Sequence, residues 1–140
     1  MNDFSCILEE DININDIDFI KKELNKYNEN FTEPDNHKIL NVIIKDNNNN
    51  ILGGLLGGTY WGWLYIDRLW IDEKYRKNGL GTKILEIAEK EAKKRGCKFA
   101  HLDTHDFQAV DFYIKKGYEI ISRLNDLPKG YNKYLMKKIL

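Results

Sequence analysis

The feature that most constrains this chain is a glycine turn between a short apolar strand and a strongly amphipathic helix. Leu69-Trp70-Ile71 is typical of a strand end, and Arg76-Lys77-Asn78-Gly79-Leu80-Gly81-Thr82 then opens a helical repeat. The stripe of that repeat consists of Leu80, Ile84, Ala88 and Ala92. Apolar residues at this spacing predict a helix from Leu80 to Arg95. The fold must therefore place a strand end beside a helix N-terminus.

This turn has the chemistry of a pyrophosphate site. Gly79 and Gly81 allow backbone N–H groups to converge, and a helix N-terminus carries about half a positive charge. Arg76 and Lys77 add full positive charges. A dinucleotide G-x-G-x-x-G motif fails because Ile84 occupies its last position, and no G-x-x-x-x-G-K-[ST] loop occurs. The segments 69–71 and 76–82 are thus the predicted cofactor site.

Two motifs in order resemble those of the GNAT superfamily of N-acetyltransferases. The R-x-x-G-x-G pattern at 76–81 resembles its coenzyme A pyrophosphate signature. The segment from Ala109 to Tyr118 is similar to a later motif, A-x-x-F-Y-x-K-x-G-F/Y. The resemblance covers roughly Ile39 to Ile139. It departs at Asp106, where the family often has Asn, and this puts in doubt a coenzyme contact from that side chain.

The resemblance implies both a fold and an activity. The implied α/β (α+β) fold has a mixed, mostly antiparallel sheet of six to seven strands, helices on both faces, and a splay near Ile71 that admits coenzyme A. The implied activity moves an acetyl group from acetyl-CoA to an amine by direct attack in a ternary complex. A backbone N–H of the strand ending at Ile71 would hold the carbonyl oxygen, and Tyr113 would protonate the leaving sulfur. Core packing of the Tyr113 ring is the alternative.

The remaining pattern predicts one N-acetyltransferase domain over 1–140. Turn chemistry at Asp46 to Asn50 and at Trp61-Gly62 indicates two hairpins, the first between Ile39–Ile44 and a strand resuming at Ile51. The other expected elements are strands at 4–8, 52–60, 63–71, 98–104, 118–124 and 134–139, and helices at about 15–27 and 109–116. The glycines of the 52–60 strand indicate either a bulge or a substrate lying against the backbone.

An amine acceptor needs a way to lose its proton. A group of pKa ~10.4 is neutral in about one molecule in 2,500 at pH 7, a cost of roughly 4.6 kcal/mol. We favour Asp67 as the base, because alternation places it on one strand face with Trp63, Tyr65, Leu69 and Ile71. Pairing of Asp67 with a Lys or Arg is the structural alternative, and Asp103 or water are alternative bases.

Other residue groups leave further interpretations open. His101, Asp103 and His105 alternate along one strand and so can share a face, as metal ligands do, but no H-E-x-x-H helix supports them and we expect no metal. The aromatic residues are typical of a core or dimer surface, with an amine cage as the alternative. They are Tyr60, Trp61, Trp63, Tyr65 and Trp70.

Composition limits the partners. The chain of 140 residues has 42% hydrophobic and 31% charged residues and a formal net charge of zero, so it shows no nucleic-acid or membrane signal. With no signal peptide and unpaired Cys6 and Cys97, a cytoplasmic protein is expected, and a homodimer stays open. The acceptor amine is unassigned. A non-catalytic acyl-CoA-binding module and a protein-interaction domain are the rival functions.

Overall fold

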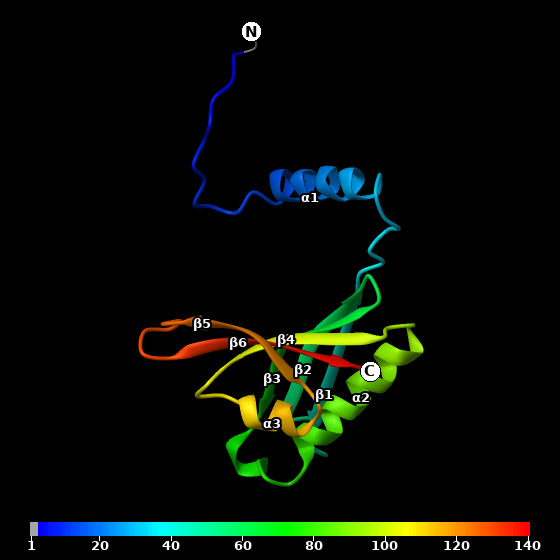
Figure 1. Ribbon diagram of the computed structural model, residues 1–140, viewed down its shortest axis with the longest axis vertical. Helices are drawn as coiled ribbons and strands as arrows, with labels where there is room; N and C mark the ends of the chain where they lie inside the picture. The colour runs from blue at the N-terminus through cyan, green and yellow to red at the C-terminus, as the bar shows by residue number, and fades with distance from the viewer. Residues whose placement is uncertain (1–2) are drawn as a thin grey trace. The chain divides into compact units, whose positions relative to one another are not determined.

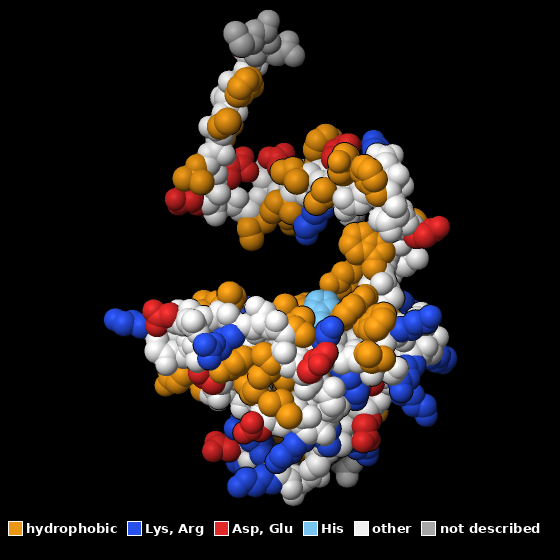
Figure 2. Space-filling view, viewed as in Figure 1, with side chains coloured by type: hydrophobic (Ala, Val, Ile, Leu, Met, Phe, Trp, Pro, Cys, Tyr) orange, Lys and Arg blue, Asp and Glu red, His pale blue; other side chains and the backbone are white. Residues whose placement is uncertain are grey.

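The computed structural model describes residues 3–140 and divides the chain into two units, residues 1–34 and 35–140. The first unit contains α1 (Ile14–Asn28), which begins at Asn13, whose side chain accepts a hydrogen bond from the Asp16 N–H at 3.3 Å. The helix expected at about 15–27 therefore extends one residue further at each end. No α1 side chain is buried, and Figure 2 shows hydrophobic side chains along the helix.

The strand predicted at Phe4–Leu8 is wrong. These residues have no regular secondary structure and all are exposed, Phe4 and Leu8 at 84% and 88%. A strand forms when its N–H and C=O groups pair with a neighbouring strand. Hydrophobic residues alone do not supply that partner, so the segment stays extended without forming a ladder.

The second unit is built on a six-stranded sheet of order β1-β2-β3-β4-β6-β5 (Figure 1). The strands are β1 (Lys38–Lys45), β2 (Ile51–Tyr60), β3 (Trp63–Ile71), β4 (Phe99–His105), β5 (Glu119–Asn125) and β6 (Asn132–Ile139). Neighbouring strands run antiparallel except β3 and β4, which are parallel. The predicted mixed, mostly antiparallel sheet is confirmed.

Both predicted hairpins form, and the turn residues predicted from the sequence close them. The Asp46 carboxylate accepts the backbone N–H groups of Asn48 and Asn50 at 2.8 Å and so closes the β1–β2 turn. In the β2–β3 turn, Trp61 and Gly62 have φ of 45° and 76° between the paired residues Tyr60 and Trp63. Positive φ at both central residues matches the right-handed twist of the flanking strands.

The core of this unit lies on one face of the sheet, under α2 (Leu80–Lys94) and α3 (Val110–Lys115) (Figure 1). The α2 helix follows the predicted apolar repeat and ends before Gly96, whose φ is 89°. Its buried stripe belongs to one core cluster with the alternate strand residues Leu64, Ile66, Ala100 and Leu102. The opposite face of the sheet is called the open face below. A helix on that face stays a prediction, as does the single-domain assignment.

No helix within residues 3–140 combines the length and the apolar character that a membrane crossing needs.

Candidate active site

The sheet opens between β3 and β4. Their parallel pairing runs from Trp63 opposite Phe99 to Ile66 opposite Leu102 and ends there. Beyond Ile66, β3 pairs only with β2, and β4 beyond Leu102 pairs only with β6. The splay therefore begins at Ile66, earlier in β3 than the expected position near Ile71. Beyond Ile66, where β3 pairs on one side only, every second N–H group points away from β2. Such an N–H group can donate to the carbonyl oxygen of a ligand.

A β-bulge at Asp67 coincides with this opening. Gly57 pairs with Ile66 and Leu56 pairs with Arg68, so Asp67 is the extra residue. The bulge shifts alternation: Leu69 returns to the core side opposite buried Leu55. The expectation that Asp67 shares one face with Trp63, Tyr65, Leu69 and Ile71 is wrong for Leu69 and Ile71, because it assumed unbroken alternation.

The glycines of β2 have a structural explanation at the same place. A Cβ on Gly57 would collide with the backbone carbonyl oxygen of Tyr65, across the bulge. A Cβ on Gly53 would lie 2.7 Å from the Ile71 side chain and 2.8 Å from the Trp70 carbonyl oxygen. The irregularity lies opposite these glycines, with its extra residue on β3 and not on the glycine-rich strand; Gly53 and Gly57 are needed because the backbones of β2 and β3 approach too closely for larger residues.

The turn before α2 has the geometry of an anion nest. A 3-10 helix, η1 (Glu73–Tyr75), leads into a loop in which Lys77 and Gly79 have φ of 66° and 76°. Gly79 is the N-cap of α2 and provides no side-chain cap. The first N–H groups of a helix have no partner within it, so those of Leu80, Gly81 and Thr82 can serve an anion.

Positive side chains surround this nest. Lys74, Arg76 and Lys77 are exposed, and Figure 2 shows Lys and Arg side chains gathered over the loop that precedes α2. The Arg76 Nε donates to the Ile71 carbonyl oxygen at 3.0 Å. Arg76 therefore ties the loop to the end of β3, a contact that the sequence motif does not reveal. The nest and the last residues of β3 are held as one unit by this bond.

Tyr113 lies on the core side of the sheet, on α3. The side chain is 5% exposed, and its ring packs edge-on against Phe112 and Tyr118. Burial raises the pKa of Tyr113 to about 12. The phenol therefore keeps its proton at neutral pH, as a proton donor must. Asp106, which replaces the family's frequent Asn, accepts the Asn132 N–H at 3.0 Å and joins the β4–α3 turn to β6.

Polar and aromatic side chains gather on the open face where the sheet begins to splay. Asp67 is half exposed, accepts the Tyr65 hydroxyl at 3.3 Å, and has the Nε of neighbouring Arg68 at 3.6 Å from its carboxylate. The Asp103 carboxylate lies 3.6 Å from the Lys133 ammonium. On the same face, the His101 ring lies in a cluster with the rings of Tyr60, Trp63 and Tyr65. Sequence reasoning considered His101 only as a metal ligand, although its alternation with Asp103 already placed the two on one face.

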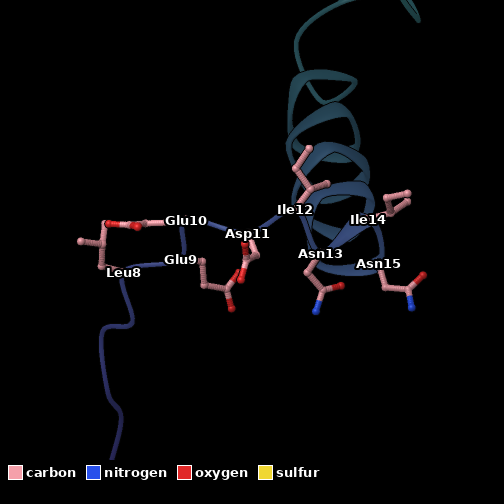
Figure 3. A pocket seen from close by; sticks show the side chains of 8 residues that line it. All are labelled: Leu8, Glu9, Glu10, Asp11, Ile12, Asn13, Ile14 and Asn15. Atoms are coloured by element: carbon pink, nitrogen blue, oxygen red, sulfur yellow. The ribbon is translucent and has the colours of Figure 1, made fainter.

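Three further features bear on alternative sites: possible metal ligands, the Cys97 thiol and a hollow in the first unit. Among residues 3–140, no group of three or more His, Cys, Asp or Glu side chains has metal-binding geometry. Cys97 is buried, and burial raises the pKa of its thiol, which disfavours the thiolate. A hollow along residues 8–15 is lined by acidic and apolar side chains of the first unit (Figure 3). None of the predicted site residues lines it.

Known proteins are similar to this chain in sequence and in fold. The profile of the acetyltransferase (GNAT) family matches residues 7–118. An acetyltransferase of Agrobacterium fabrum is 41% identical over 91 residues, which are 65% of this chain and 66% of that protein. The blasticidin-S acetyltransferase of Streptomyces morookaense is 38% identical over 91 residues, 64% of this chain and 67% of that protein. The chain thus spans about two thirds of the length of these curated relatives.

The fold comparison covers more of the chain. The crystal structure of an acetyltransferase from Agrobacterium tumefaciens superposes with a TM-score of 0.90 at 31% identity, over 98% of this chain and 100% of that one. The predicted fold and the predicted enzyme class, acetyltransferase with acetyl-CoA as the acyl donor that the class uses, are confirmed. Because the family profile covers residues 7–118, most of the sequence, the chain belongs to the acetyltransferase (GNAT) family.

Proposed function

We propose that this chain transfers the acetyl group of acetyl-CoA to a primary amine of a small molecule or peptide, by direct attack in a ternary complex. The observation that carries the proposal is the splay of β3 from β4 beside the uncapped N-terminus of α2. A pyrophosphate on that N-terminus directs the pantetheine arm along the open edge of β3. The thioester then reaches the level of Asp67, near the aromatic side chains of the open face.

The donor side uses backbone groups for binding and one side chain for chemistry. N–H groups at 80–82 bind the pyrophosphate, with Arg76 and Lys77 adding charge. An N–H of the stretch Leu69–Ile71 stabilises the oxyanion, and one such donor is worth about 3 kcal/mol. Tyr113 donates its proton to the departing coenzyme A sulfur.

The reaction conserves atoms without a covalent enzyme intermediate. The amine nitrogen forms a bond to the thioester carbon, the carbon–sulfur bond breaks, and the sulfur takes a proton while the nitrogen loses one. Holding both substrates in one site replaces a bimolecular encounter, which contributes several kcal/mol. Asp67, the base predicted from the sequence, lies at the splay and is suited by charge to hold a cationic amine there.

A release assay tests the proposal. Free coenzyme A thiol is measured during incubation of acetyl-CoA with spermidine, an aminoglycoside, blasticidin S and a peptide with a free N-terminus, and mass spectrometry identifies an acetylated product. Blasticidin S is included because a relative is named for it. Acetyl-CoA binding without turnover on any amine would favour the acyl-CoA-binding module. Absence of binding would favour a protein-interaction domain.

We further propose a cytoplasmic, homodimeric protein. The free thiols of Cys6 and Cys97 support a reducing compartment. Exposed apolar residues at the β1 to β3 side of the open face support self-association: Ile39 is 65% exposed and Trp70 is 50% exposed. Light scattering after size-exclusion chromatography measures the mass, and a value near the 16.5 kDa of one chain would contradict the dimer.

A further inference from the structure

His101 is surrounded by aromatic rings on the open face of the sheet. Its ring centroid lies 4.9 Å from that of Tyr65, 5.5 Å from that of Trp63 and 6.0 Å from that of Tyr60. These rings come from β2 and β3, while His101 is on β4, so the cluster spans three strands. Faces of tyrosine and tryptophan rings attract cations within about 6 Å. The cluster is therefore suited to a cationic ligand.

A hydrogen bond connects two members of the cluster. The Tyr60 hydroxyl lies 2.9 Å from His101 Nε2. In the tautomer with its proton on Nδ1, Nε2 holds a lone pair and accepts this bond. The phenol and the imidazole then form a chain along which a proton can move toward Nε2.

The charged and titratable groups around His101 leave the imidazole neutral. Burial lowers the pKa of His101, and the Asp103 carboxylate opposes that shift in part. The titratable and charged groups near the cluster come from several strands and one loop. They are Tyr60 on β2, Tyr65 and Asp67 on β3, Asp103 on β4 with its partner Lys133 on β6, Lys137, which pairs with His101 on β6, and His37 beside the Tyr60 ring. Lys137 is itself paired with Glu119 at 3.6 Å. The imidazole is thus able to accept a proton at neutral pH.

The cluster lies at the apex of the splay. Tyr65 and His101 pair directly, one position before the pairing of β3 with β4 ends at Ile66 and Leu102. Asp67 and Asp103 are the first acidic residues beyond that point, one on each of the separating strands. An ammonium held by these carboxylates would lie between the cluster and the opening that admits the thioester.

We propose that the open-face cluster is the acceptor site for a cationic amine and that Tyr60 and His101 form the proton relay that frees its lone pair. This inference rests on the proposed function. The N–H bond of the ammonium breaks as its proton passes to the Tyr60 oxygen. The original phenol proton passes to Nε2, and the imidazolium takes over the positive charge. The neutral nitrogen then attacks the thioester, while Asp67 and Asp103 bind the cation.

The relay is tested by the pH dependence of single and double variants, His101→Gln, Tyr60→Phe and both together. The substrate is whichever of spermidine or blasticidin S gives the higher wild-type kcat/KM. Each single variant is expected to lose about 10²-fold in kcat at pH 7, the lower end for an acid–base group. The difference in kcat between each variant and wild type is expected to become smaller toward pH 9.5, because more of the amine is already neutral there. The double variant is no slower than the worse single variant, since both remove the same relay.

A matched control is His37→Gln. His37 is exposed, and its ring centroid lies 6.4 Å from that of Tyr60, but the hydroxyl of Tyr60 bonds to His101. It is expected to retain wild-type kcat at every pH. Losses for His101→Gln that are equal at all pH values, or multiplicative losses in the double variant, would overturn the relay.

A second measurement separates this inference from the proposed function. If wild type acetylates no amine, the proposed function fails, and carbon-13 NMR of the His101 imidazole decides the acceptor site. Spermidine is expected to shift the His101 resonance, and Tyr60→Phe is expected to move its titration midpoint. An unmoved resonance and midpoint would overturn the inference even in an active enzyme.

Discussion

The Lys138 ammonium on β6 lies 2.8 Å from both carboxylate oxygens of Glu89 on α2. Glu89 is 9% exposed and sits among core residues, so its charge depends on this partner. The Lys138 ammonium also lies 5.5 Å from the centre of the Tyr118 ring. Burial and, second, the Glu89 carboxylate raise the pKa of Tyr118 far above its usual range. The ion pair of Lys138 and Glu89 therefore connects α2 to β6.

Lys138→Met is expected to destabilise the fold by about 3 kcal/mol, because it leaves a buried carboxylate without a partner. Urea unfolding followed by circular dichroism measures the loss. The double variant Glu89→Gln/Lys138→Met removes both charges and is the control, expected to recover most of the stability. A single variant as stable as wild type would show that solvent already screens the pair.

Gly81→Asp is expected to weaken acetyl-CoA binding by about 10²-fold, about 2.7 kcal/mol, because a carboxylate then occupies the pyrophosphate position. The fold is expected to survive, since a Cβ at Gly81 lies at ordinary contact distance, 3.4 Å, from the Phe112 ring. Calorimetry measures the affinity. Gly81→Asn has the same shape without the charge and should lose less, and equal losses would mean that size rather than charge matters here.

Tyr113→Phe is expected to lower kcat by about 10²-fold while leaving acetyl-CoA affinity unchanged. The substitution removes the hydroxyl and keeps the ring contacts with Phe112 and Tyr118, so the melting temperature should shift by only a few degrees. A phenol of pKa about 12 is a weak donor to a thiolate, which keeps the expected loss at the low end. Unchanged turnover would make Tyr113 a packing residue and leave water as the acid.

Asp67→Asn is expected to raise KM for a cationic amine by about tenfold, with the same loss at pH 7 and pH 9. This uniformity follows if Asp67 holds the ammonium and the relay takes its proton. The amide oxygen can still accept the Tyr65 hydroxyl, so the bulge is preserved. Asp111→Asn, an exposed change on α3, is the control. A loss in kcat confined to low pH would instead make Asp67 the base.

The sequence alone determined the features that depend on neighbours along the chain. The α2 repeat, its start after Gly79 and its end before Gly96 follow from side-chain spacing and from positive φ that glycine tolerates. The two hairpins follow from turn residues in the same way. The motif at Arg76 to Gly81 predicted both the nest and the family, because the whole nest lies within one short segment.

Only the tertiary structure decided which residues meet across the sheet. Tyr60 and His101 are 41 positions apart, and their bond depends on the register of β3 against β4. The bulge at Asp67 reverses the faces of the residues that follow it, so alternation read from the sequence misplaced Leu69 and Ile71. The face that a strand residue occupies depends on how its strand pairs with neighbouring strands. That pairing is set by residues that are distant in sequence. For the same reason, an apolar run at Phe4–Leu8 without a partner strand formed no strand.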